Sequence, residues 1–181
     1  DKFYRTGTTL SNTISFSTGS ENGNTRFSLT NLDNDDISPN STLDRNQIGV
    51  NTSQQLGDNL RVDANMKYIL EDQSGNPRLS DGPGNANWII NNYAPSMDVN
   101  WAKGPNGDGR NDDLTEYRAT PSIYIQNPWF AQNYYINDAE KERFIGSTNI
   151  RWDLADFLYV RGQVGMDRFD AHRTMSEPYG T

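Results

Sequence analysis

Five aromatic side chains between two strongly patterned stretches of the chain are the residues best suited to binding chemistry. They are Trp88, Tyr93, Trp101, Trp129 and Tyr134. Aromatic rings stack on the C–H groups of sugars or on peptide side chains, and the many nearby asparagine and aspartate residues supply hydrogen bonds. The set predicts a glycan or peptide site. The alternative is that these rings form the small core of their own connection, because so long a connection must be packed or disordered.

Catalytic and metal chemistry find little support in the residue types. His172 is the sole histidine and cysteine is absent, so histidine metal sites, catalytic triads and thiol nucleophiles lack their residues. Residues 108–113 lack the spacing and the distal glutamate of an EF-hand, so we expect a solvated turn there. No local motif singles out a glycosidase-like pair among the 24 acidic residues. We predict no enzymatic activity, no metal site and no cofactor.

The net charge of −8 argues against a nucleic-acid partner. Binding to a phosphate backbone needs clustered lysine and arginine, and no such cluster stands out along this acidic chain. An acidic chain with asparagine-rich connections instead suits an exposed surface that handles neutral polar ligands.

The secondary structure that must position these residues is most clearly predicted at residues 60–70, where apolar and polar side chains alternate. A strand projects successive side chains to opposite faces, so one face of this strand is apolar and the other is charged. The run is long enough to cross a bilayer, which takes about 9–11 tilted residues. The alternation alone leaves open whether the apolar face meets a protein core or lipid.

Similar alternation recurs along the chain and predicts six strands. Their approximate bounds are 9–18, 24–32, 43–53, 59–71, 142–153 and 156–170. A short helix is expected within residues 86–94, because Pro95 then ends it.

The predicted connections are sorted by length. Those at 19–23, 54–58 and 154–155 are short, whereas those at 33–42 and 72–141 are longer. Short turns at one end and long loops at the other are typical of outer-membrane β-barrels. A soluble secreted β-sandwich, such as a carbohydrate-binding module, is the alternative, although a sandwich has no reason to sort its loops by side.

A series of short motifs near the start of the chain has a family resemblance. Residues 3–7, 11–19, 25–32, 37–41 and 43–46 read FYRTG, SNTISFSTG, TRFSLTNL, ISPNS and LDRN. Together with Asn127-Pro128-Trp129 and the strand start at 142–146, this ordered series resembles the SusC/RagA family of TonB-dependent outer-membrane transporters from Bacteroidetes. The likeness is densest over the first 46 residues and looser over the rest.

The resemblance implies an all-β fold, an antiparallel transmembrane β-barrel segment of about six strands with short periplasmic turns and long extracellular loops. Residues 1–181 would form part of the barrel domain of a longer chain, and residues 72–141 its long extracellular loop. Such proteins import oligosaccharides or peptides across the bacterial outer membrane. They act with a SusD-like surface lipoprotein and with the TonB complex, which they contact through parts that these residues do not include.

The barrel interpretation assigns the two faces of the sheet. The residues expected to meet outer-membrane lipid are Leu60, Val62, Met66, Ile150, Val160 and Val164. Those expected to face the lumen are Arg61, Asp63, Lys67, Arg151, Arg161 and Asp167. Slipping a strand by one residue would bring its charges into hydrocarbon at about 2–4 kcal/mol for each arginine or lysine at the midplane, so the register is strongly specified.

Overall fold

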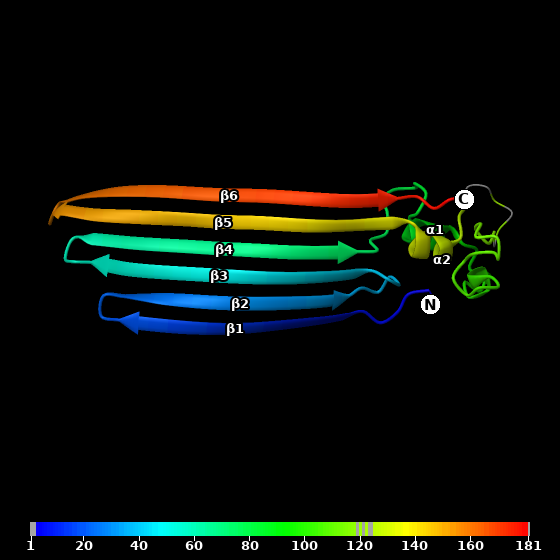
Figure 1. Ribbon diagram of the computed structural model, residues 1–181, viewed down its shortest axis with the longest axis horizontal. Coiled ribbons are helices and arrows are strands. Elements are labelled where there is room, and N and C mark those ends of the chain that lie inside the picture. The colour runs from blue at the N-terminus through cyan, green and yellow to red at the C-terminus, as the bar shows by residue number, and fades with distance from the viewer. Residues whose placement is uncertain (1–2, 119, 121, 123–124, 181) are drawn as a thin grey trace.

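The computed structural model describes residues 3–118, 120, 122 and 125–180, and within them the chain is mostly β. One six-stranded antiparallel sheet follows the chain order from β1 to β6 and stays open, and two short helices lie in the connection between β4 and β5 (Figure 1). The elements are β1 Thr8–Ser20, β2 Gly23–Asp35, β3 Thr42–Leu56, β4 Leu60–Ser74, α1 Ala86–Asn92, the 3-10 turn η1 Trp101–Lys103, α2 Pro128–Tyr134, β5 Ile136–Ala155 and β6 Leu158–Ser176.

The prediction of six strands is confirmed, but the strands run beyond the predicted bounds. β5 begins at Ile136 and β6 ends at Ser176, because backbone pairing continues where polar side chains occupy both faces and the alternation fades. The third short turn lies at residues 156–157 rather than at 154–155, since β5 has an irregularity between Asp153 and Ala155. The connection from β4 to β5 is therefore residues 75–135, shorter than the predicted 72–141.

The strand register separates the two predicted sets of side chains. Val62 pairs with Ile150, and Ile150 pairs with Gly162. On the neighbouring row Arg61 pairs with Arg151, which pairs with Arg161. Paired residues point to the same side of a sheet, so the six side chains predicted to meet lipid share one face and the six predicted to face a lumen share the other.

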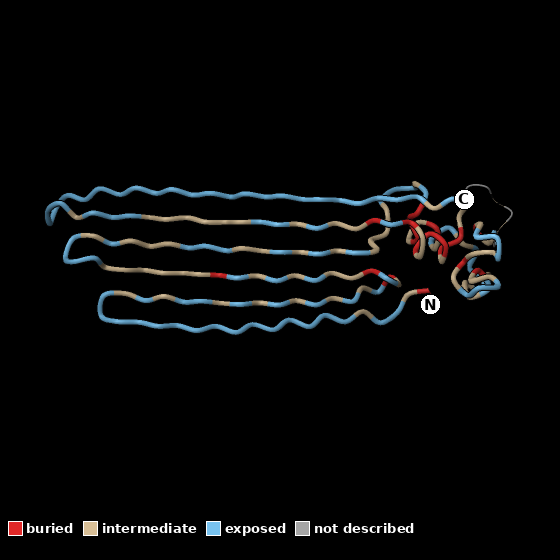
Figure 2. The backbone as a smooth tube through the Cα atoms, in the orientation of Figure 1, coloured by how far each residue is buried: buried red, intermediate tan, exposed pale blue. Residues whose placement is uncertain are grey.

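The apolar face is exposed along the whole sheet. Ile48 on β3 is 54% exposed and Met66 on β4 is 41% exposed, although both strands lie inside the sheet. Figure 2 shows the strands mostly in the colours of exposed and intermediate residues, with one buried stretch on β3, whereas most buried residues gather at one end. Within the described residues no second layer covers this face, and no helix is long and apolar enough to cross a membrane.

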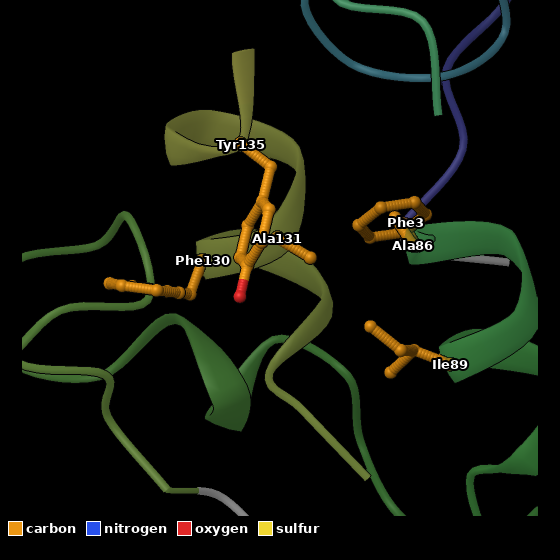
Figure 3. Close-up of a cluster of buried hydrophobic side chains, with 6 residues drawn as sticks. All are labelled: Phe3, Ala86, Ile89, Phe130, Ala131 and Tyr135. Carbon is orange, nitrogen blue, oxygen red and sulfur yellow. The ribbon is translucent and has the colours of Figure 1, made fainter. Parts of the chain in front are cut away.

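The hydrophobic core is formed by residues 75–135, which we call the loop unit, together with Phe3, at the end of the sheet opposite the short turns (Figure 1). Its buried side chains come from α1, from α2 and from the N-terminal segment, and Figure 3 shows them facing one another. They are Phe3, Ala86, Ile89, Phe130, Ala131 and Tyr135. The loop unit is thus a packed unit with its own core.

Both helices begin at an asparagine that caps them. The Asn85 side chain accepts a hydrogen bond from the Trp88 backbone N–H, and α1 ends at Asn92, which confirms the helix predicted within residues 86–94. At α2, Asn127 accepts from the backbone N–H groups of Trp129 and Phe130, and proline occupies the first helical position. This second helix was not predicted, although Asn-Pro is a helix-start signal.

Candidate functional site

A cavity lies beside α1 in the described part of the loop unit and is the more enclosed of the two hollows described below. Its volume is about 400 Å³, within the range of small-ligand sites. Its lining combines apolar and polar residues. Its lining residues are Asp81, Gly82, Pro83, Trp88, Ile89, Glu116, Arg118, Ser122, Ile125 and Gln126.

Glu116 is the buried charged group of this cavity, with only 7% of the residue exposed. It accepts a hydrogen bond from the Asn127 backbone N–H at 2.5 Å, and its own backbone N–H donates to the Gly180 carbonyl. Burial raises the pKa of Glu116, although the Asn127 bond and the nearby Arg118 charge act against that rise. A carboxyl group held in this way favours its neutral form more than an exposed glutamate does.

Asn127 holds this part of the loop unit together. Its buried side-chain amide donates to the carbonyl oxygens of Ala102 and Tyr117 at 2.5 and 2.7 Å, while its oxygen caps α2. One side chain therefore joins η1, the segment that carries Glu116 and the start of α2. The cavity wall is positioned by hydrogen bonds rather than by packing alone.

Four of the five predicted ligand-binding aromatics pack against the core of the loop unit, namely Trp88, Tyr93, Trp129 and Tyr134. Trp88 also lines the cavity. The Trp129 indole N–H donates to the Val99 carbonyl at 2.8 Å, and the Tyr134 hydroxyl donates to Asp108. Trp101 differs, since it is 58% exposed and has an edge contact with Tyr117. The structure therefore does not gather the five rings into one site.

Tyr93 borders a second, more open hollow of about 490 Å³ formed by residues 93–99 and Ile90. Its hydroxyl is buried and has no hydrogen-bond partner among the described residues. Burial and the negative charge of Glu116 raise the pKa of Tyr93 to about 12. This hydroxyl stays protonated at any physiological pH, so it can offer a hydrogen bond but no negative charge.

Residues 108–113, expected to form a solvated turn, carry carboxylates that bond within the loop. Asp108 accepts from the Arg110 backbone N–H at 3.0 Å, and Asp113 accepts from the Thr115 hydroxyl at 2.6 Å. In the described part of the chain, no group of three or more His, Cys, Asp or Glu side chains is placed to hold a metal ion.

Sequence reasoning found Trp88 but missed Glu116, Arg118 and Gln126. Each is a single polar residue in an irregular connection, and nothing in the local sequence marks Glu116 among 24 acidic residues. Their grouping depends on the fold of the loop unit. Together with the Trp88 ring they can hold a polar ligand by stacking and by hydrogen bonds of both polarities.

We predict that Glu116→Gln removes a pH dependence of the stability of the loop unit. In the unfolded chain Glu116 has the ordinary value of 4.5, and in the folded protein its pKa is higher, so the folded state binds more protons between the two values. The contribution of Glu116 to stability is therefore fully present below pH 4.5 and is lost as the pH rises through its raised pKa. Amide hydrogen exchange of residues 85–92 and 127–135 at several pH values measures this slope.

The matched control is Asp81→Asn, a second carboxylate on the same cavity wall. We expect the pH slope to survive that change. An unchanged slope in Glu116→Gln would contradict the assignment of the pH dependence to Glu116.

Comparison with protein-family models finds no match to this chain, and comparison with curated proteins also finds none.

Proposed function

We propose that this chain forms part of the wall of a bacterial outer-membrane β-barrel that imports oligosaccharides or peptides. The observation that carries the proposal is the exposed apolar face of the sheet, which no other described residue covers. Monomeric soluble proteins rarely expose apolar patches beyond a few hundred Å², and larger ones mark interfaces with protein or membrane. Lipid on this face, with further strands at both edges of the sheet, satisfies the apolar side chains and the unpaired edges.

The height of the apolar band suits a bilayer. On β4 the apolar positions run from Leu60 to Leu70, which is roughly 33 Å along the strand and roughly 23 Å across a membrane at a 45° tilt. Outer-membrane barrels carry an apolar band about 25 Å tall. Just beyond it, Asp72 lies on the same face and pairs with Asp44 on one side and Glu140 on the other. This row of carboxylates belongs outside the hydrocarbon.

The short turns step along the sheet as they do in a barrel with tilted strands. Gly23, beside the first turn, pairs with Gln54, which pairs with Val62. The second turn joins Leu56 to Leu60, so it lies further out on the sheet than Gln54. The third turn lies further out again, beyond Trp152, the residue that pairs with Leu60. Figure 1 shows each successive hairpin reaching further in the same direction. A barrel wall needs this stagger in its hydrogen-bond register.

The charge pairs of the polar face support the proposal that this face points into the barrel interior. Its charges pair across strands: Glu71 bridges Arg45 and Lys141 at 2.5 and 2.7 Å. Such ladders suit a water-filled or plugged interior, and they would be costly against lipid.

The loop unit then lies at the extracellular end, where the cavity beside Trp88 faces incoming ligand. A SusD-like surface lipoprotein would meet the same end of the barrel, and coupling to the TonB complex would come from other parts of the protein. By this proposal the chain has no enzymatic activity.

The alternative function is a secreted β-sandwich carbohydrate-binding module. It requires a second sheet packed about 10 Å above the apolar face. The alternative keeps the loop unit as a glycan site, but it gives no reason for the staggered turns.

Cell fractionation tests the proposal. We expect the native protein only in the outer-membrane fraction, released by detergent and with a lower gel mobility after boiling, as a barrel unfolds. Recovery from the periplasm or the medium without detergent would reject the membrane proposal and favour the sandwich.

A further inference from the structure

Three arginines stand side by side on the polar face near the short turns. Arg61 on β4 pairs with Arg151 on β5, which pairs with Arg161 on β6. Directly opposed like charges in a sheet repel one another, so a row of three needs neighbouring negative charge to be favourable. The three side chains line one hollow of about 280 Å³, together with Asp63, Asn149 and Tyr159.

The protein neutralises this row only in part. Arg61 contacts Asp63 at 3.2 Å, and Arg151 contacts Asp153 at 2.8 Å. The third guanidinium, that of Arg161, donates through Nε to the Asn149 amide oxygen at 2.6 Å and has no carboxylate partner among the described residues. Three positive charges thus meet two negative ones.

Another basic residue of the same face is matched by a carboxylate. Arg143, on the same strand as Arg151, makes two hydrogen bonds to the Asp167 carboxylate at 2.9 and 2.6 Å. Unlike Arg143, the arginine row keeps an uncompensated positive charge, on a chain whose net charge is −8.

The hollow also offers unused donors in a fixed arrangement. The Arg151 guanidinium lies over the Tyr159 ring at 4.4 Å, which holds its plane, and the Asn149 side chain joins Asp63 to Arg161. Among the described residues, the terminal nitrogens of Arg161 make no hydrogen bond. Guanidinium groups bind carboxylate and phosphate oxygens in pairs, so this arrangement suits an oxyanion.

We propose that Arg61, Arg151 and Arg161 form a binding site for a small anion that carries carboxylate or phosphate groups. Only the location of this site in a barrel lumen rests on the proposed function, because in the proposed barrel the polar face of the sheet would point into the lumen. There it would select imported ligands that carry an acidic group.

The test measures citrate binding to the full-length native protein in detergent by isothermal titration calorimetry, with sodium chloride at matched ionic strength as the control solution. We expect saturable binding, weakened about tenfold or more in Arg151→Gln and in Arg161→Gln, because each change removes charged donors from the site. The citrate affinity of Arg151→Lys should lie between that of the unchanged protein and that of Arg151→Gln, because lysine keeps the charge and loses the planar pair of donors.

The matched control is Arg143→Gln, which removes an arginine from the same strand and face whose charge Asp167 already balances; its citrate affinity should equal that of the unchanged protein. Equal binding by all variants, or no saturable binding by the unchanged protein, would overturn the proposal. Either result leaves the fractionation test of the membrane proposal unaffected, so the two failures can be told apart.

Discussion

Met66→Arg should destabilise the protein in a bilayer by about 2–4 kcal/mol, the cost of an arginine on the lipid face near the midplane of a barrel. Met66 lies in the middle of the apolar band, between Val50 on β3 and Gly146 on β5, and is 41% exposed. In the proposed barrel its side chain is surrounded by lipid tails that cannot hydrate a guanidinium. Denaturant unfolding in lipid vesicles, followed by tryptophan fluorescence, measures the difference.

The adjacent residue supplies the control. Asn65 points to the polar face and pairs with Asn51 and Ser147, so Asn65→Arg should change the unfolding free energy by less than about 1 kcal/mol. Equal effects of the two substitutions would mean that the two faces meet the same surroundings, which would contradict a lipid-facing sheet.

Phe130→Ala should destabilise the loop unit by about 3–5 kcal/mol and leave the sheet folded. The Phe130 side chain is fully buried, and its ring lies 5.2 Å from that of Tyr134 and 6.4 Å from that of Tyr135, so its removal opens a cavity at the centre of a small core. The strands do not depend on this core, because backbone pairing joins each to its neighbour. Amide hydrogen exchange should therefore rise in residues 85–135 and stay slow in β3 and β4.

Leu79→Ala provides the matched control, since Leu79 belongs to the same loop unit but is 85% exposed. We expect no measurable change in exchange. If Phe130→Ala instead loosened the strands as much as the loop unit, the loop unit would not be an independent core.

The strands were predictable because the physical signal is local. A period of two along β4 is enough to separate its two faces, and the register of the structure places the six named apolar residues on one face and the six named charged residues on the other. The ends of β5 and β6 were not predictable in the same way. Around Glu140 and His172, which pair with each other, both faces carry polar groups, so strand pairing leaves no trace in the hydrophobic pattern.

The loop unit was predictable only in its simplest parts. Pro95 marked the end of the first helix, whereas the cavity depends on contacts between residues distant in sequence. The Asn127 side chain reaches Ala102, and the Tyr4 hydroxyl donates to Asn87 at 2.8 Å. No local pattern reveals such contacts, so the position of Glu116 could be learned only from the structure.

The most direct test of the central claim is a cysteine scan of β4, which is feasible because these 181 residues contain no cysteine. Residues 60–69 of the native protein are replaced by cysteine one at a time, labelled with a bimane fluorophore and reconstituted in vesicles that contain brominated lipids. We expect strong quenching at even-numbered positions such as Val62 and Met66, and weak quenching at odd-numbered ones such as Asp63 and Lys67. Quenching without this alternation, or absent at every position, would contradict a sheet whose apolar face meets lipid.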